Sequence, residues 1–280
     1  MPPLARRDVR SLVRKLGAHA RPAQQKQALI TIEWLTTCGR HGIDRESLVA
    51  IAAAGAIPPL VQLLGPGSSA DVQTRAAGAL CNLAQHDDNA VTIVAAGAIQ
   101  PLVLLLGPGS TADMQQRAAA ALNNLAKDAD NQVAIAAAGA IPLLVQWLGP
   151  GATALMEYAA GAVARLAVND DNQVAIAAAG AIPPLVLLIA PGSLALVQRN
   201  AAAALMSLAQ NADNQVMISA AGAITAMVQL LGPGSDDLPK RFAATALKFL
   251  AYSNKNRAAI VAASASADVD VLKEMERLAI

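Results

Sequence analysis

The chain has 280 residues and a formal net charge of +1, so its total charge favours neither nucleic acid nor a membrane surface as a partner. Hydrophobic residues make up 55% of the chain but aromatic residues only 2%, and the excess consists of alanine, leucine, valine and isoleucine. Because alanine is the strongest helix former and lets helices approach closely, this composition predicts many short, tightly packed helices.

The first part of the chain, residues 6–37, reads as two helices, VRSLVRKLG followed by PAQQKQALITIEWLTTCG. Up to Arg45 this region holds nine basic residues against three acidic ones. We interpret these charges as the solvated outer face of an end unit. A docking site for an acidic partner is the alternative.

No apolar stretch suited to a signal peptide follows Met1. The two cysteines, Cys38 and Cys81, show no metal-binding or redox spacing, and Cys81 lies in an apolar run that predicts a buried side chain. These features predict a reducing compartment. We therefore expect a cytoplasmic location, with the nucleus as the alternative.

From residue 54 onward the tetrapeptide Ala-Gly-Ala-Ile occurs five times. Its glycines are Gly55, Gly97, Gly139, Gly180 and Gly222, at intervals of 42, 42, 41 and 42 residues. A fixed period of about this size indicates a stacked repeat array. In such an array each unit packs on its neighbours, so one elongated domain can grow without enlarging a single core.

Each repeat reads as three helices. In the unit DNQVAIAAAGAIPLLVQWLGPG, Asp130 or Asn131 is placed to cap a first helix that ends at Gly139. Pro142 then opens a second short helix, since the first turn of a helix tolerates a missing backbone N–H. The equivalent capping pairs in the other units are Asp88/Asn89, Asp171/Asn172 and Asp213/Asn214.

The third helix of a unit is longer, as in DVQTRAAGALCNLAQ at residues 71–85. Apolar residues at helical spacing predict its buried face. These residues are Val72, Ala76, Ala79, Leu80 and Leu83.

Unit boundaries follow from the repeated pattern. Full units are expected near residues 44–86, 87–128, 129–169, 170–211 and 212–253. Residues 6–37 form a partial unit without a first helix, and residues 254–280 form a C-terminal cap with a polar outer face. We expect a single domain over residues 1–280.

Three helices in about 42 residues, with AGAIPPLVQLL opening the second helix and ALCNLA closing the third, resemble the armadillo repeat family. HEAT repeats, the nearest alternative, normally have two helices. The resemblance covers nearly the whole chain. It implies an all-α, right-handed α–α superhelix, a solenoid whose third helices line a concave groove, and an intracellular scaffold for protein–protein interaction.

The best-known peptide binders of that family carry a Trp and an Asn four residues apart on the third helix, where the Asn amide holds the ligand backbone. The Asn position here holds Asn82, Asn124, Arg165, Ser207 and Phe249, and the Trp position holds Gly78, Ala120, Gly161, Ala203 and Thr245. The resemblance therefore supports backbone binding by Asn82 and Asn124. It argues against an importin-α-like nuclear transport adaptor, which we keep as an alternative. For both asparagines a structural or solvated role is the other interpretation.

Arginines recur along the same predicted face. They are Arg75, Arg117, Arg165, Arg199 and Arg241, and Tyr158 and Ser207 are placed beside them. The only carboxylate placed on this face is Glu157. We therefore hypothesise that the groove binds an extended, acidic or phosphorylated peptide, since arginine makes paired hydrogen bonds to such groups. The charge pattern resembles the basic groove of β-catenin. The alternative is that these arginines pair with aspartates between units, such as Asp71 or Asp113.

The sequence predicts no catalytic residues, no metal site and no cofactor, because the three histidines are scattered and no HExxH, GxSxG or P-loop pattern occurs. Residues 172–198 carry no charge, but glycines and prolines divide them into short helices, so we expect no membrane insertion. The expected partner is a protein or peptide. The remaining alternatives are a structural repeat array and a weak nucleic-acid binder. A monomer is favoured, although the sequence leaves the oligomeric state open.

Overall fold

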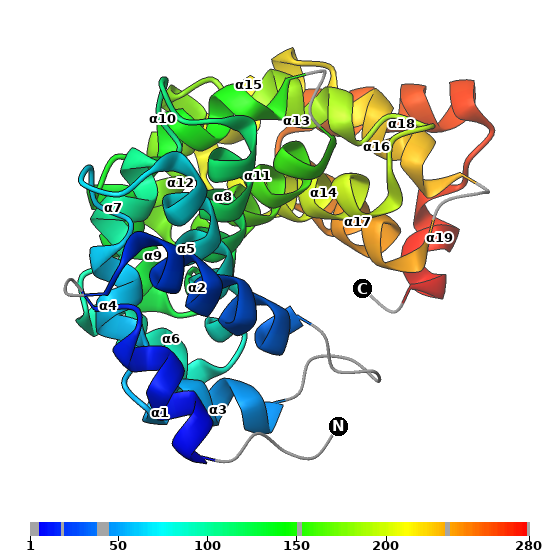
Figure 1. Ribbon diagram of the computed structural model, residues 1–280. Helices are drawn as coiled ribbons and strands as arrows, with labels where there is room; N and C mark the ends of the chain where they lie inside the picture. The colour runs from blue at the N-terminus through cyan, green and yellow to red at the C-terminus, as the bar shows by residue number, and fades with distance from the viewer. Residues whose placement is uncertain (1–5, 18–19, 38–44, 150–152, 233–235, 279–280) are drawn as a thin grey trace. The chain divides into compact units, whose positions relative to one another are not determined.

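The computed structural model describes residues 6–17, 20–37, 45–149, 153–232 and 236–278, and within these ranges the regular structure is entirely helical (Figure 1). This confirms the predicted all-α class. Cys38 and the first residue of the predicted unit 44–86 lie outside the described residues, as do most of the GPG turn after Leu148 and the last two residues of the predicted C-terminal cap. Contacts divide the chain into two compact units, residues 1–140 and 141–280. We call them unit 1 and unit 2 and describe each by itself.

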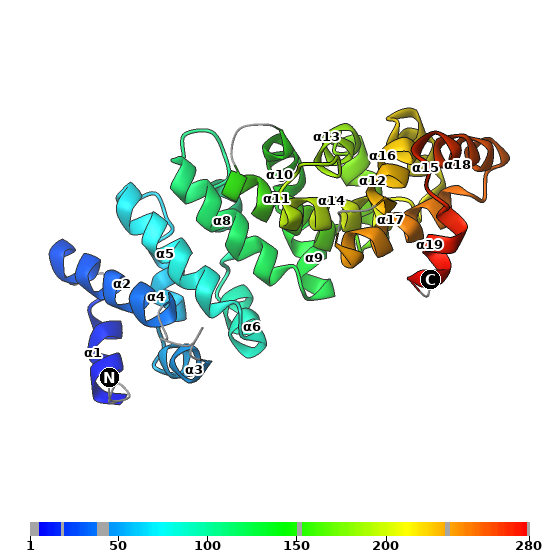
Figure 2. The same ribbon diagram turned by 90° about the vertical axis from the view of Figure 1, so that its right-hand side faces the viewer.

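Unit 1 contains helices that follow the predicted order within a repeat. The first helices are α3 (Arg45–Ala53), α6 (Asp87–Ala95) and α9 (Ala129–Ala137). The second helices are α1 (Arg6–Arg14), α4 (Ile57–Gln62) and α7 (Ile99–Leu104). The third helices are α2 (Pro22–Thr37), α5 (Ala70–Leu83) and α8 (Ala112–Leu125), and they pack side by side (Figure 2).

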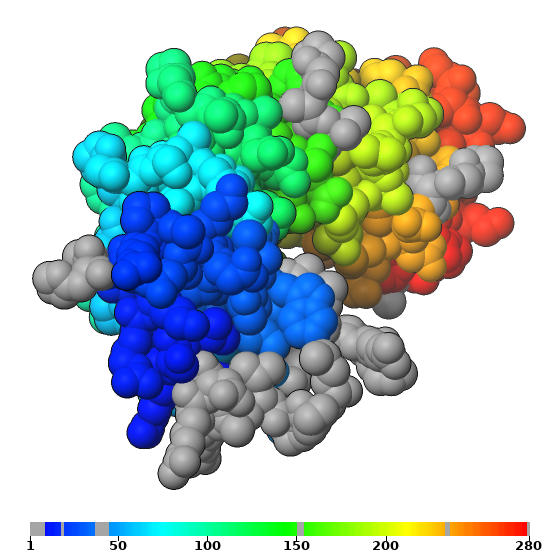
Figure 3. Space-filling view, viewed as in Figure 1, coloured from blue at the N-terminus to red at the C-terminus, as the bar shows by residue number. Residues whose placement is uncertain are grey.

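Unit 2 repeats the same pattern. Its second helices are α10 (Ala140–Val145), continued by the 3-10 helix η1 (Gln146–Leu148), then α13 (Ile182–Leu188), α16 (Ala223–Leu231) and α19 (Val271–Arg277). Its first helices are α12 (Asp170–Ala178), α15 (Ala212–Ala220) and α18 (Asn254–Ala267). Its third helices are α11 (Thr153–Leu166), α14 (Ala195–Leu208) and α17 (Asp237–Leu250). In the space-filling view the repeats of unit 2 lie next to one another in chain order, from green to red (Figure 3).

The repeated glycine separates the first helix from the second because it adopts a conformation that other residues avoid. Gly97 and Gly139 have φ values of 80° and 82°, in the left-handed region. A Cβ atom at either position would meet nothing within 4 Å, so the requirement is one of backbone conformation and not of space. The predicted end of the first helix is thereby explained.

The capping residue of the first helix lies earlier than the sequence predicted. In α9 the carboxylate of Asp128 accepts a hydrogen bond from the backbone N–H of Asn131 at 3.1 Å. The Asn131 side chain is buried instead, and its amide donates to the carbonyl of Leu125 at 3.0 Å. Asn169 and Asn211 cap α12 and α15 in the same way. The predicted Asp-Asn pair thus lies inside the helix. Asn131 and Asn172 donate to a carbonyl at the end of the preceding third helix, whereas Asn89 and Asn214 donate to a carbonyl in the first helix of the preceding repeat.

The core is formed by the third helices and by the helices that cover them. All five residues predicted for the buried face of α5 are buried, with Val72 the most exposed at 9%. Alanines such as Ala76 and Ala118 are fully buried, which lets neighbouring third helices approach closely. The third helices therefore present their remaining, polar faces on one surface of each unit.

A glutamine in the first or second turn of the third helix ties it to the second helix, a contact that the sequence did not reveal. Gln115 donates from Nε2 to the carbonyls of Leu106 and Gly107, at 3.4 and 3.2 Å. Gln73 and Gln198 make the equivalent bonds. These bonds satisfy carbonyl groups that a helix leaves unpaired at its C-terminus.

Among the described residues no single helix is long and apolar enough to cross a membrane. Three pairs of consecutive helices reach the required length and composition only when they are counted together across a sharp bend.

Candidate functional site

The polar face of the third helices in unit 1 contains a network of ion pairs. Glu33 on α2 binds two arginines from the next two third helices: Arg75 Nη1 lies 3.0 Å from Oε2, and Arg117 Nη2 lies 3.3 Å from Oε1. Arg75 also donates from Nε to Asp71 at 3.1 Å, and Lys26 lies 2.9 Å from the other oxygen of Asp71. The network therefore connects α2, α5 and α8.

The electrostatics of this network centre on two carboxylates. The Glu33 side chain is only 17% exposed, so solvent screens its two ion pairs less than it screens a surface pair. The hydrogen bond from Lys26 is the main cause that lowers the pKa of Asp71, and the charge of Arg75 adds to it. Asp71 is thus held ionised beside Arg75 near neutral pH.

Gly78 explains how the ion pair can cross α5. A Cβ atom at this position would lie 3.2 Å from Oε1 of Glu33 and 3.4 Å from Nη1 of Arg117. This is the position where the family's peptide binders carry a tryptophan. Here the space above the glycine is filled by the Arg117–Glu33 ion pair, so a large side chain has no room unless that pair moves.

The two predicted backbone-binding asparagines form contacts between repeats. Asn82 on α5 donates from Nδ2 to Oγ1 of Thr36 on α2 at 3.0 Å. Asn124 on α8 donates from Nδ2 to the carbonyl oxygen of Cys81 at 3.0 Å, and a sulfur contact to the same residue measures 3.7 Å. These contacts support the interpretation that both asparagines have a structural role. Their role toward a ligand stays a prediction.

Cys81 shows no sign of acting as a nucleophile. Burial raises the pKa of its thiol to about 11, so the group is protonated near neutral pH. Within the described residues no cluster of three or more histidine, cysteine, aspartate or glutamate side chains could hold a metal ion.

The polar face of the third helices in unit 2 is different, because there the charge of one arginine acts on another. Burial is the main cause that lowers the pKa of Arg165 on α11, and the positive charge of Arg199 on α14 lowers it further. Arg199 has no carboxylate within ion-pair distance among the residues that the structure describes, and neither has Arg241 on α17. This face therefore concentrates positive charge.

The other predicted residues of unit 2 take varied positions. Tyr158 is half-buried on α11, next to Glu157, whose backbone carbonyl accepts a hydrogen bond from Asn200 at 3.3 Å. Ser207 is only 3% exposed, so its hydroxyl does not lie on the surface. The structure thus brings Arg165 and Arg199 together and leaves Ser207 inside the unit.

Sequence reasoning missed Glu33, although it belongs to the same face as Arg75 and Arg117. The partial first unit lacks the Ala-Gly-Ala-Ile marker, so the register of its third helix had no anchor. A signal was present in the charge pattern: Glu33 is the only acidic residue between Asp8 and Asp44, in a segment rich in arginine and lysine. The statement that Glu157 is the only carboxylate on this face is therefore corrected.

Comparisons with known proteins agree with this architecture. Residues 44–85 and 86–127 each match the family model of the armadillo/beta-catenin-like repeat. One engineered protein of known structure is 30% identical, with a TM-score of 0.76, and the match covers 88% of this chain and 97% of that one. A second engineered protein is 32% identical with a TM-score of 0.83, covering 97% of this chain and 67% of that one. A search of curated proteins finds no match.

A third solved structure is a designed armadillo repeat protein in complex with the peptide (KR)4. It is 26% identical to this chain with a TM-score of 0.73, and the match covers 87% of this chain and 99% of that one.

Proposed function

This chain belongs to the armadillo repeat family, and from that premise we propose that it is a protein-interaction scaffold whose ligand is an extended peptide with acidic or phosphorylated side chains. In either unit the ligand lies along the third helices of that unit. Its anionic groups bind arginines, and its main chain contacts the asparagines near the ends of α5 and α8.

The observation that supports an acidic ligand most directly is the pair Arg165 and Arg199. Two guanidinium groups close enough for one charge to lower the pKa of the other raise the free energy of the unliganded protein. A carboxylate or phosphate between them removes this repulsion and accepts several charge-assisted hydrogen bonds. Arg165 is also partly buried, which strengthens such an interaction over one in open water.

In unit 1 the same chemistry requires an exchange. Glu33 already accepts a hydrogen bond from Arg75 and forms an ion pair with Arg117. A ligand carboxylate must therefore displace Glu33 or share these two arginines with it. We therefore assign the stronger anionic contacts to unit 2. Asn124 retains a contact for the ligand backbone, because no described residue donates a hydrogen bond to its side-chain oxygen.

A basic peptide is the alternative ligand, because the structure of one designed relative contains the peptide (KR)4. Lysine or arginine side chains on this chain would meet Arg165, Arg199 and Arg241. The Trp positions, which in the resemblance form slots for lysine and arginine stems, hold glycine, alanine or threonine. Both features argue against a basic peptide and therefore against the nuclear transport adaptor.

The proposal is tested by fluorescence anisotropy with three labelled octapeptides: an Asp/Glu peptide, (KR)4, and a neutral Gly/Ser peptide of equal length. We expect the acidic peptide to bind at least about tenfold more tightly than either of the others, which corresponds to about 1.4 kcal/mol. Its affinity should fall as salt rises, because exposed charges are screened within about 10 Å at 0.1 M ionic strength. Tighter binding of (KR)4 would refute the acidic ligand.

A further inference from the structure

Glu33, Arg75 and Arg117 form a cluster in which a carboxylate of the chain itself lies between two arginines. The three residues come from successive third helices of unit 1, α2, α5 and α8 (Figure 2). Arg75 Nη1 lies 3.0 Å from one oxygen of Glu33, and Arg117 Nη2 lies 3.3 Å from the other. Each oxygen of one planar carboxylate thus binds a different guanidinium group. A ligand's aspartate or glutamate would bind two arginines in the same way.

Gly78 on α5 forms the floor of this cluster. A Cβ atom at this position would lie 3.2 Å from Oε1 of Glu33 and 3.6 Å from Cδ of Arg117. The carboxylate and the Arg117 side chain therefore both lie close over α5, at a point where the helix carries no side chain. Any added side chain would require the carboxylate to shift, so the glycine leaves room for this group and for little more.

The charges around the cluster favour a monoanion. Arg75 donates from Nε to Asp71 at 3.1 Å and from Nη1 to Glu33, so one guanidinium group serves two carboxylates. A phosphate in the place of Glu33 would carry a charge of about −1.5 to −2 near neutral pH, and it would share Arg75 with the negative charge of Asp71. The Glu33 side chain is also only 17% exposed, and burying a second negative charge there costs more than burying one.

The contacts of α2 do not depend on Glu33 alone. α2 packs on α5, and its Leu29 and Ile32 are fully buried. Thr36, near the end of α2, accepts a hydrogen bond from Asn82 on α5 at 3.0 Å. These contacts hold α2 in place when the carboxylate of Glu33 leaves the arginines and turns toward solvent.

We propose that Arg75, Arg117 and Gly78 form a site that binds a carboxylate in preference to a phosphate, and that Glu33 occupies it as an internal competitor until a partner's aspartate or glutamate side chain takes its place. The inference rests on the acidic ligand proposed above and names the anionic group that unit 1 accepts. Because α2 holds Glu33 next to the site, the effective concentration of its carboxylate there is high. A partner's carboxylate therefore binds more weakly than it would to the same site without Glu33.

The site can be tested without any peptide, by supplying a free carboxylate to a variant that lacks its own. Glu33→Ala should lower the urea midpoint, and sodium acetate should restore part of the loss in a saturable manner, because an anion that binds only the folded protein stabilises it by mass action. Sodium chloride and sodium phosphate at equal ionic strength should restore less. The wild type in the same salts corrects for the general effect of each anion on stability. Equal responses of variant and wild type to acetate, or an equal gain with phosphate, would overturn the proposal.

Second substitutions in the Glu33→Ala protein locate the bound acetate. Arg117→Gln should abolish the acetate effect, and Gly78→Ala should weaken it because the added Cβ atom narrows the site. The matched control is Glu276→Ala alone, which removes an exposed carboxylate from α19, and acetate should affect it as it affects the wild type. An acetate effect that persists in Glu33→Ala/Arg117→Gln would assign the anion to another place and contradict the proposal.

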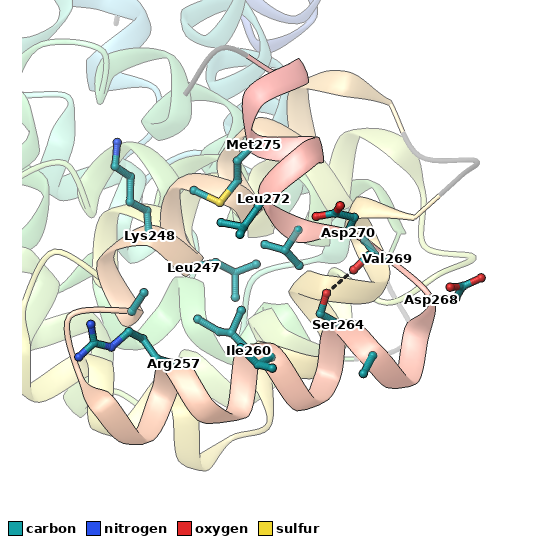
Figure 4. A pocket seen from close by; sticks show the side chains of 14 residues that line it. Leu247, Lys248, Arg257, Ile260, Ser264, Asp268, Val269, Asp270, Leu272 and Met275 are labelled. Carbon is teal, nitrogen blue, oxygen red and sulfur yellow. Dashed lines mark hydrogen bonds between the residues drawn. The ribbon is translucent and has the colours of Figure 1, made fainter.

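A cavity of about 650 Å³ in unit 2, between α17, α18 and α19, provides a control for anion binding elsewhere (Figure 4). Its walls are mainly apolar, and Lys248 and Arg257 lie on one side of the apolar centre. Arg257 already donates a hydrogen bond to Asn254. We therefore expect Glu33→Ala/Lys248→Gln to keep the full acetate effect. Loss of the effect in this double variant would place the acetate in the cavity and overturn the proposal.

Peptides test the competition and the choice of anion, in a protein that carries Arg165→Gln/Arg199→Gln so that binding in unit 1 is measured. The probes are two labelled Gly/Ser octapeptides, one with a central glutamate and one with a central phosphoserine. Adding Glu33→Gln, which keeps the size of the side chain, should tighten the glutamate peptide at least about tenfold and the phosphoserine peptide less. An equal or larger gain for phosphoserine, or no gain for glutamate, would contradict the proposal.

The acetate and peptide measurements separate this inference from the proposed function. Acetate rescue without any peptide binding would leave the carboxylate site standing and refute the peptide-binding scaffold. Binding of the acidic peptide without acetate rescue would support the scaffold and refute the site assigned to Arg75, Arg117 and Gly78.

Discussion

The two units present third-helix faces with the same kind of side chain in opposite electrostatic states. In unit 1, Arg75 and Arg117 share the carboxylate of Glu33, and Arg75 also pairs with Asp71. In unit 2, Arg165 lies beside Arg199, which has no carboxylate within ion-pair distance among the described residues. A ligand carboxylate must replace an existing partner in unit 1, whereas in unit 2 it supplies one for Arg199. A run of arginines in a sequence therefore does not by itself define an anion-binding face.

We expect the third helices of both units to be packed equally tightly, and the largest expected effect on unfolding free energy tests this. Leu83→Ala in α5 and Leu208→Ala in α14 each remove a leucine with 0% exposure. Each should lower the free energy of unfolding by about 2–5 kcal/mol, as for other buried leucines. Urea unfolding followed by circular dichroism measures the change. A loss below about 1 kcal/mol in only one unit would show that its third helix is loosely packed, and the comparison would then fail.

Neutralising Glu33 should leave the arginines of unit 1 without their shared carboxylate and so make this face more like that of unit 2. Glu33→Gln leaves Arg75 and Arg117 without their shared charge, so we expect a loss of about 1–3 kcal/mol in unfolding free energy. The same change should tighten binding of the Asp/Glu octapeptide. Glu276→Gln on α19, an exposed position, serves as the control with the same chemical change. An unchanged affinity for the acidic peptide in Glu33→Gln would mean that unit 1 takes no part in binding it.

Neutralising one arginine in each unit should have opposite consequences for stability. Arg117→Gln removes an ion pair with Glu33 and should destabilise the protein by about 0.2–1 kcal/mol. Arg199→Gln removes a like charge beside Arg165, so stability should stay constant or rise slightly. Thermal and urea unfolding of the two variants under identical conditions give the comparison. If Arg199→Gln is the more destabilising change, Arg199 has a stabilising partner and our description of unit 2 is wrong.

The smallest expected effect is the acid sensitivity of Asp71 in unit 1. Its pKa is lowered in the folded protein, so its contribution to stability is present above the unfolded pKa of about 3.9. That contribution is lost as the pH falls through the lower, folded pKa. Because the side chain is 43% exposed, we expect less than about 1 kcal/mol. Asp71→Asn should flatten the pH dependence of the urea midpoint below about pH 4, and an unchanged profile would remove Asp71 from the network.

The regular parts of this fold could be predicted because each is set by residues close together in sequence. Gly139 ends the first helix by its backbone conformation, and apolar spacing in residues 71–85 defines the buried face of α5. The N-cap residue was predicted wrongly because several polar residues lie near the start of each first helix. Only packing decides that the Asn131 side chain is buried and that Asp128 caps α9.

The candidate site was less accessible to prediction because its contacts join residues more than 40 positions apart. Asn82 and Asn124 were expected on the third helices, but their bonds to Thr36 and Cys81 depend on how neighbouring helices stack. The partners of Arg117 could not be foreseen, since Glu33 lies two third helices away and reaches it across Gly78.

The most direct test of the acidic-ligand proposal is a titration of the Asp/Glu octapeptide into two double variants, Arg165→Glu/Arg199→Glu in unit 2 and Arg75→Glu/Arg117→Glu in unit 1. The double variant Lys255→Glu/Lys273→Glu, at two exposed cations on α18 and α19, controls for the same change in net charge. We expect the unit 2 variant to lose at least about tenfold more affinity than the unit 1 variant, which is about 1.4 kcal/mol. Unchanged or tighter binding by the Arg165→Glu/Arg199→Glu variant would contradict the account.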